Sequence, residues 1–356
     1  MKIHTIIFFL MTLLVSCQNK SKNTMEKYEW EESTSAPLGY PIEVYRGGFS
    51  TKEGAFVSLY GGTTTGTNGW GYPSGGMSNN KKTIPDHLHV IWLSYAEDAM
   101  FEIDTDIDRE KITDYFNKGY DWKTLNNSGE IRHKNYSSIV VGFAPGGVVV
   151  IWVSGSGIQK EIGRYQGKKI EIPQAEIDAL DYPDKTLFEA EYRRKKFAQD
   201  NMVPLEIQVA NKNKPIPFGL WDTYRKKYQW KPTFKLEDGA ILDDKTTTGI
   251  NYLNGEVEKF FHENFPLKTY SNNAIPKSVS FSWKDRDEIK YGAGANLNEE
   301  SALAAFKEVY SDHPETVHAD LEIKINIPNT FFTVTLKGNN GKEVFIKTEN
   351  VEVFKR

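Results

Sequence analysis

Two groups of residues in this 356-residue chain have side chains of the types that bind metal ions, at spacings that partly match known metal sites. The run from Asp104 to Asp108 places carboxylates at alternate positions, as the start of a calcium loop does, but Arg109 and Tyr115 occupy positions that need Gly and Glu. His87 and His89 lie on one face of an expected strand, and the neighbouring sequence offers no third ligand. We therefore predict a pair of surface or half-buried histidines, with no metal site and no cofactor.

The motifs of nucleophilic catalysis are not found in the sequence. Ser154 and Ser156 lack the preceding Gly of a nucleophile elbow, and the segment 338–342 is too short for a phosphate-binding loop. Carboxylates are plentiful, but a sequence gives no distance between them, so a pair suited to glycoside hydrolysis stays open. We assign no catalytic residue.

A loop over residues 61–76 is rich in Gly and Thr and contains Trp70 and Tyr72. Such a loop can present aromatic rings to a sugar or to a protein partner, because loops carry recognition on a rigid scaffold. A long hairpin excursion without a ligand explains the composition equally well, so both interpretations remain open.

A basic segment follows in the middle of the chain, with cations at 193–196 and 225–227. Aromatic residues are interleaved with these cations: Tyr192, Trp221, Tyr224, Tyr228 and Trp230. One interpretation is a patch for an anionic partner or lipid headgroup, including Tyr224, Arg225 and Trp230. A solvated helix face over aromatic packing is the interpretation that we favour.

The first seventeen residues have the pattern of a secretory signal. Lys2 precedes a ten-residue apolar run at 6–15, which rises only about 15 Å as a helix and is too short to span a bilayer. The run ends at Cys17, the only cysteine, in a pattern that resembles the bacterial lipobox. We expect removal of residues 1–16, lipid attachment at Cys17 and a flexible tether over 17–27. The tether is not acidic, which favours an outer-membrane position facing the periplasm.

The composition indicates a globular chain whose fold is stabilised by hydrophobic cores. Hydrophobic residues are 39% and aromatic residues 13%, which excludes a disordered or polytopic membrane protein. A net charge of −4 offers no basic field for nucleic acid, so we predict no nucleic-acid partner. With one cysteine, the chain cannot form an internal disulfide.

An internal repeat is indicated by two similar stretches about 190 residues apart. Ile84-Pro85 precedes Trp92 as Ile275-Pro276 precedes Trp283. A capped helix at 108–116 matches another at 298–306, and strands at 138–143 and 148–154 match strands at 320–327 and 331–337. We predict an α+β fold with two related antiparallel sheet units, 28–172 and 228–356, each with one packed helix, joined by a helical bridge over 173–227.

The order of several short motifs resembles a known bacterial lipoprotein family, domain of unknown function 2931. The motifs are Pro41, Pro85 with Trp92, Pro145-Gly146-Gly147 before Trp152, Glu161 to Arg164, and Tyr224 to Trp230. The similarity covers about residues 28–235, with a looser second copy after it. It implies a lipid-anchored envelope protein for which the family has no established catalytic residues.

These observations favour a non-enzymatic binding protein held at a membrane through lipid on Cys17. One version is an immunity protein that neutralises a toxin in the periplasm. The alternatives are recognition of envelope glycan through Trp70 and Tyr72, and a hydrolase that uses carboxylates paired in space.

Overall fold

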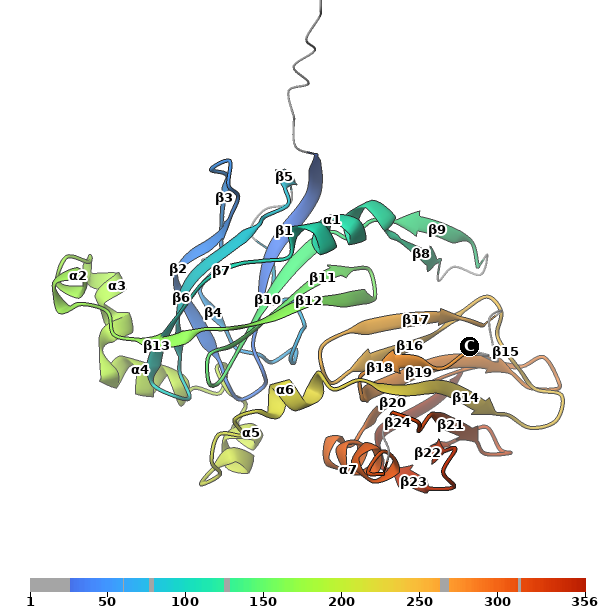
Figure 1. The fold of residues 1–356 in the computed structure, drawn as a ribbon. Helices are drawn as coiled ribbons and strands as arrows, with labels where there is room; N and C mark the ends of the chain where they lie inside the picture. Colours follow the sequence, from blue (N-terminus) through green and yellow to red (C-terminus); the bar gives the residue numbers. More distant parts are fainter. Residues whose placement is uncertain (1–25, 60, 77–79, 125–128, 263–268, 313–314) are drawn as a thin grey trace, which may run out of the picture.

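The computed structural model describes residues 26–59, 61–76, 80–124, 129–262, 269–312 and 315–356. Cys17 and the predicted signal therefore lie outside the described residues. Within these ranges the chain is mostly β-sheet with few helices, in agreement with the α+β expectation at that level (Figure 1). None of the helices described is long and apolar enough to cross a membrane.

The first half of the chain forms two sheets with α1 and a small hairpin beside them. Its elements are β1 (Lys27–Ser35), β2 (Ile42–Ser50), β3 (Phe56–Ser58), β4 (Thr63–Thr64), β5 (Asn80–Thr83), β6 (His87–Ser94), β7 (Ala99–Asp106), α1 (Arg109–Lys118), β8 (Tyr120–Lys123), β9 (Ile131–Lys134), β10 (Ser138–Ala144), β11 (Val148–Gly155), β12 (Ile158–Gln166) and β13 (Lys168–Ile170). One sheet has the order β5-β1-β10-β11-β12, and the other has β13-β7-β6-β2-β3.

Short helices then lead to the second half. They are α2 (Gln174–Asp178), α3 (Tyr182–Lys185), the 3₁₀ helix η1 (Thr186–Phe188), α4 (Ala190–Phe197), α5 (Leu205–Asn211) and α6 (Leu220–Tyr224). In Figure 1, α2 to α5 lie beside the first half and α6 leads across to the second.

The second half contains a further group of strands and one longer helix. These are β14 (Tyr228–Lys235), β15 (Ile241–Leu242), β16 (Thr247–Tyr252), β17 (Val257–Phe261), β18 (Ser271–Asn273), β19 (Pro276–Lys284), β20 (Lys290–Leu297), α7 (Glu299–Val309), β21 (Ala319–Ile325), β22 (Phe332–Gly338), β23 (Glu343–Ile346) and β24 (Thr348–Lys355). They form a β18-β14-β21-β22-β23 sheet and a β24-β20-β19-β16-β17 run.

The strand pairings follow the same order in both halves. β1 runs parallel to β10, which continues antiparallel through β11 to β12; likewise β14 runs parallel to β21, which continues through β22 to β23. The second sheet is β2-β6-β7-β13 in one half and β16-β19-β20-β24 in the other. Antiparallel pairing of β12 with β17, at Gln159 and Val257, joins the halves into one eleven-stranded sheet.

Both helices predicted to begin at capping residues form where the sequence places them. Asp108 accepts a hydrogen bond from the Lys111 amide at 2.9 Å, and Asn298 accepts one from the Ser301 amide at 3.0 Å. Each cap satisfies a backbone N–H that the first helical turn leaves without a partner. α7 then buries Ala302, Ala305, Phe306 and Val309, whose spacing gives one apolar face.

The apolar strands β10 and β11 are buried on both faces, which explains their nearly continuous hydrophobic sequence. One face packs into a core between the two sheets of the first half, with Ile139, Val141, Val149 and Ile151. The other face, with Val140, Val150 and Trp152, joins a larger core that extends into the second half. The two halves therefore share a continuous hydrophobic core.

Candidate functional site

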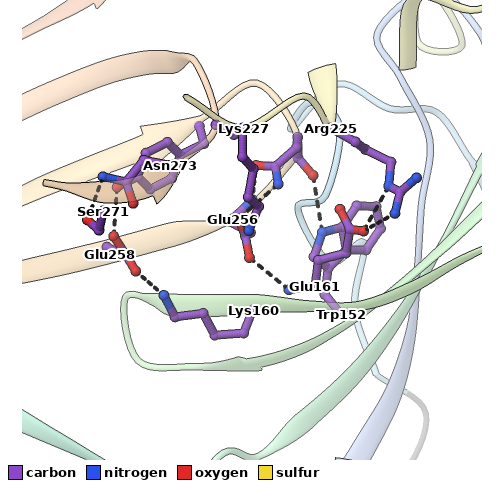
Figure 2. Close-up of polar contacts among 12 residues, drawn as sticks. Trp152, Lys160, Glu161, Arg225, Lys227, Glu256, Glu258, Ser271 and Asn273 are labelled. Carbon is purple, nitrogen blue, oxygen red and sulfur yellow. Dashed lines mark hydrogen bonds and ion pairs between the residues drawn. The ribbon is translucent and has the colours of Figure 1, made fainter. Parts of the chain in front are cut away.

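Charged residues from three separate segments meet where the halves join. β12 contributes Lys160 and Glu161, the segment after α6 contributes Arg225 and Lys227, and the start of β17 contributes Glu258, preceded by Glu256 (Figure 2). The local sequence accounts for the third segment, because Asn254-Gly255 is a tight-turn dipeptide between β16 and β17. We call this cluster of six charged residues the junction cluster.

Arg225 holds Glu161 at the edge of the cluster. Its Nε and Nη2 atoms lie 2.8 Å and 2.7 Å from Glu161 Oε1. Glu161 Oε2 is buried, and no hydrogen-bond partner for it is present among the described residues. Arg225 was a predicted partner-binding residue, and in the structure its guanidinium pairs with Glu161 of the preceding half.

Glu256 is the most enclosed acid of the cluster. Lys227 Nζ lies 2.7 Å from its Oε2 atom, the Asn254 amide donates to Oε2 at 2.9 Å, and the Glu161 backbone N–H donates to Oε1 at 3.3 Å. Burial would raise the pKa of Glu256, but Lys227, the Asn254 hydrogen bond and Lys160 outweigh it and hold that pKa below its ordinary value.

Glu258 and the neighbouring Arg164–Asp222 pair are further acids held by cations at the junction. Glu258 pairs with Lys160 and accepts a hydrogen bond from the Tyr252 hydroxyl at 2.7 Å. Burial and the Glu258 carboxylate hold the pKa of the Tyr252 hydroxyl well above its ordinary value. Arg164 makes a two-pronged contact with Asp222 of α6, at 2.9 Å and 3.0 Å.

The geometry of the junction cluster indicates a structural role, in which its ion pairs hold separate segments of the chain together. A general acid needs a carboxyl group that stays protonated near neutral pH, and the lowered pKa of Glu256 opposes this. Glu161 and Glu258 are likewise engaged by cations. The contacts connect β12, the segment after α6 and the β16–β17 turn, so the cluster crosslinks the two halves.

Trp70 lies against the same junction with its ring packed inward, so it does not offer the exposed ring that the glycan alternative requires. Its side chain is 6% exposed and makes an edge contact with Trp152, with ring centroids 5.0 Å apart. The close fit is possible because residue 142 is Gly; a Cβ there would lie 2.8 Å from the Trp70 ring. Tyr72 is half-buried, with Lys277 Nζ 5.7 Å from its ring centroid.

Tyr224 and Trp230 are also buried, as the favoured interpretation of aromatic packing expects, and the alternative of a surface patch does not hold for these two rings. The Tyr224 hydroxyl donates to Glu299 Oε1 at 2.5 Å, and burial followed by this carboxylate raises the pKa of the hydroxyl. Trp230 has no exposed surface, and its Nε1 atom donates to the Ala274 carbonyl at 3.1 Å. Trp70, Tyr224 and Trp230 therefore belong to the core that the two halves share.

Two cations of α4 face the first half of the chain. Arg193 pairs with Asp98 at 2.5 Å and Lys196 with Glu43 at 2.6 Å. Lys196 also lies 5.6 Å from the centroid of the Tyr95 ring. These contacts match the favoured interpretation of a helix face over aromatic packing for this part of the basic segment.

A groove of about 530 Å³ opens between α4, α5 and the loop that follows β1. Its apolar lining includes Tyr40, Phe197, Val203, Leu205, Val209 and Ile216. Leu205 and Val209 are 63% and 65% exposed, although each is a large apolar side chain. Sequence reasoning did not find this groove, whose only local signal is the spacing of four residues that puts Leu205 and Val209 on one face of α5.

The two histidines considered for metal binding contact neighbouring acids at hydrogen-bond distance. His87 contacts Asp104 at 2.7 Å and Asp106 at 3.0 Å, and His89 contacts Glu102 at 3.1 Å. The Asp106 and Asp104 contacts, against partial burial, raise the pKa of the His87 imidazole. In the part of the chain that the structure describes, no group of three or more acids, histidines or cysteines is arranged to hold a metal ion.

Comparison with known proteins identifies the family. No curated protein and no solved structure matches the chain. Residues 17–219, more than half of the chain, match the family described as protein of unknown function (DUF2931). The match begins at Cys17 and ends before α6, so the motif from Tyr224 to Trp230 that contributed to the expected resemblance lies beyond it. The chain belongs to the DUF2931 family.

Proposed function

We propose that this chain is a lipid-anchored protein of the bacterial envelope that binds a partner protein and is not an enzyme. Residues 1–16 act as the signal, Cys17 carries the lipid and residues 17–27 form the tether. The start of the family match at Cys17 supports this assignment. We propose that the anchor lies in the outer membrane and that the protein faces the periplasm. One specific version of the function is neutralisation of a toxin delivered into that compartment.

The observation that carries the proposal is the position of the α4–α5 groove relative to the tether. β1 begins at Lys27, directly after the tether, and Lys27 lines a pocket at that end together with Phe56 and Lys81. Gly39 and Tyr40, just past the other end of β1, line the groove. Nine strand residues span about 30 Å, so α5 and the loop after β1, which line the groove, lie at the opposite end of the first half from Lys27 (Figure 1).

The alternatives have weaker support. Recognition of envelope glycan was expected to use Trp70 and Tyr72, but Trp70 is buried and Tyr72 is half-buried. A hydrolase was expected to use two free carboxylates, but those of the junction cluster are engaged by Arg225, Lys227 and Lys160. We therefore place binding of a protein partner first.

We further propose that the chain contains two related units, 28–172 and 228–356, joined by a bridge over 173–227. The identical order of strand pairing in both halves supports an internal duplication. The positions of the two longer helices support it as well. In the chain, α1 follows β7 and precedes β10, and α7 follows β20 and precedes β21, which are the corresponding strands of the second half. Most residues that line the groove belong to the bridge, and Gly39, Tyr40 and Ala96 come from the first unit.

Affinity capture from the native envelope tests the function. The bait is tagged mature protein with Cys17→Ser, which removes lipid-driven recovery, and mass spectrometry identifies both proteins and released glycans. We expect one stoichiometric protein. Recovery of glycan alone would replace the proposal with sugar recognition, and an empty capture would count against both. Separately, metabolic labelling with a radioactive fatty acid should mark the wild type and not Cys17→Ser.

A further inference from the structure

We propose that the α4–α5 groove receives an acidic segment of a partner protein, whose apolar side chains fill the groove and whose carboxylates meet its cationic rim. The inference rests on the proposed binding function, to which it adds the chemistry of the partner. It does not depend on the lipid anchor.

Charge is the first support. Three cations line the groove, Arg194, Lys212 and Lys214, and no Asp or Glu is among its described lining residues. All three cations are exposed, and no carboxylate of the described chain lies within ion-pair distance of any of them. The other cations of α4, Arg193, Lys195 and Lys196, are paired with acids, so Arg194 on the groove side is the cation of this helix that stays available. A positive rim attracts and orients an acidic partner.

The exposed apolar lining is the second support. Leu205 and Val209 leave more than half of their surfaces in water, and Phe197 and Ile216 continue the apolar lining. Contiguous apolar surface with a polar rim is typical of a protein interaction site. The volume of about 530 Å³ lies within the range of roughly 300–1,000 Å³ that is usual for ligand sites.

The groove is already formed without a partner. Asp200 Oδ1 accepts a hydrogen bond from the Leu205 amide at 2.7 Å, and Gln208 Nε2 donates to the Val203 carbonyl at 2.7 Å. Gly39 permits close packing of α5, because a Cβ there would lie 2.8 Å from Asn211 Nδ2 and 3.0 Å from Ile207 Cγ2. A preformed site binds with a smaller loss of conformational entropy.

A protein segment fits this place better than the anchoring bilayer does. The groove opens at the end of β1 away from the tether, whereas Lys27 and Phe56 lie at the tether end. The ten peptide units from Cys17 to Lys27 reach at most about 35 Å from the anchor, and β1 adds about 30 Å more. The usual ligand of such an open groove is an extended segment with alternate apolar side chains, or a helix with apolar side chains three and four residues apart.

Selection from a random peptide library on the purified Cys17→Ser mature protein tests the inference. We expect enriched peptides with net negative charge and several apolar residues. Their dissociation constants, measured by fluorescence anisotropy, should rise at least tenfold in Val209→Glu and in the triple variant Arg194→Glu, Lys212→Glu, Lys214→Glu. A new selection on the triple variant should enrich basic peptides.

Matched variants on the second half provide the controls. Phe345→Glu changes another exposed apolar residue, and Lys324→Glu another exposed cation; neither should alter binding. Circular dichroism melting checks that every variant folds. Neutral or basic enriched peptides, no enrichment, or unchanged affinity in Val209→Glu would overturn the assignment. So would stronger binding of oleate or of anionic phospholipid vesicles at the groove than of any peptide.

Affinity capture distinguishes a failure of the groove assignment from a failure of the proposed binding function. If affinity capture recovers the same stoichiometric protein with Val209→Glu as with the unchanged groove, the binding function stands and the groove assignment fails. If capture recovers nothing and the library selects no peptide, both fail.

Discussion

Gln159 and Gly255 are joined across the junction by a hydrogen bond of 2.7 Å, from the side-chain amide of Gln159 to the backbone carbonyl of Gly255. The same amide donates to the carbonyl of Gly71, also at 2.7 Å. One buried side chain therefore connects β12, the loop 61–76 and the β16–β17 turn. Its position beside the β12–β17 pairing makes it a central contact between the two halves.

Gln159→Leu should destabilise the protein by about 2–4 kcal/mol, because it leaves two buried carbonyl groups without donors. Urea unfolding followed by circular dichroism measures the change in the free energy of unfolding. Gln199→Leu is the control, because Gln199 is exposed in the turn after α4, and this variant should stay within about 0.5 kcal/mol of the wild type. Equal effects of the two substitutions would contradict the role of Gln159.

Gly255→Ala should be more damaging than the same change at a glycine with open surroundings. Gly255 has φ +87°, and an added Cβ would lie 2.9 Å from Gly71 Cα and 3.1 Å from Trp152 Cζ2. Gly341 has φ +81° with nothing within 4 Å, so Gly341→Ala reports backbone strain alone, about 1–2 kcal/mol. We expect Gly255→Ala to lower the unfolding free energy by at least about 1 kcal/mol more, because overpacking is added. Thermal melting of both variants decides this.

The stability contributed by Glu256 should be lost in acid. Its folded-state pKa lies below the ordinary value of 4.5, so the contribution is complete above that pH and disappears as the pH falls through the folded-state pKa. Lys227→Met should raise the pKa of Glu256 and cost about 1 kcal/mol at pH 7. The difference between variant and wild type should shrink toward pH 3.

Urea titrations between pH 3 and pH 7 provide that measurement. Lys226→Met is the matched neighbour, because Lys226 is exposed and makes no ion pair with any described residue. A loss of stability that is the same at every pH would show that Lys227 acts through packing and not through Glu256.

Lys277→Met should stabilise the protein by about 0.5–1.5 kcal/mol. Burial lowers the pKa of Lys277, although Glu299 partly opposes this. Among the described residues no carboxylate or other acceptor lies within hydrogen-bond distance of its Nζ atom, which lies 5.7 Å from the centroid of the Tyr72 ring. The apolar Met stem keeps the packing and removes the charge.

The pH dependence gives a second test of Lys277. Because its folded-state pKa is lowered, charging it opposes folding at neutral pH, and this cost disappears as the pH rises toward the ordinary value of 10.5. The advantage of Lys277→Met over the wild type should therefore decrease between pH 8 and pH 10. Lys324→Met, at an exposed site, should show no advantage at either pH.

Local signals predicted the helices and the main strands well. Asp108 and Asn298 cap α1 and α7 as expected, and the apolar runs at 138–143 and 148–154 form β10 and β11. These features depend on hydrogen bonds and burial within a few residues of chain. The pairing of β12 with β17 has no such signal, because one register pair between distant strands leaves no periodic pattern.

The prediction of the site was less successful for a physical reason that Trp70 illustrates. A Gly-rich loop with an aromatic ring has the same composition whether the ring faces water or packs inward. Here the loop 61–76 returns over β10 and β11, where Gly142 leaves space for the ring. For Tyr224 and Trp230 the favoured interpretation was aromatic packing, and both rings are buried. The interleaved cations left a surface patch open as an alternative, because spacing along the chain does not show which way a ring points.

The sequence by itself determined the secretory signal pattern, the family, the capped helices and the strands with their apolar faces. Each of these features depends on residues that lie close together along the chain. Only the tertiary structure decided that Glu161, Arg225 and Glu256 meet, that the halves share one core, and that α4 and α5 leave a cation-rimmed groove. These features depend on the path of the backbone between segments far apart in sequence, and local propensities do not specify that path.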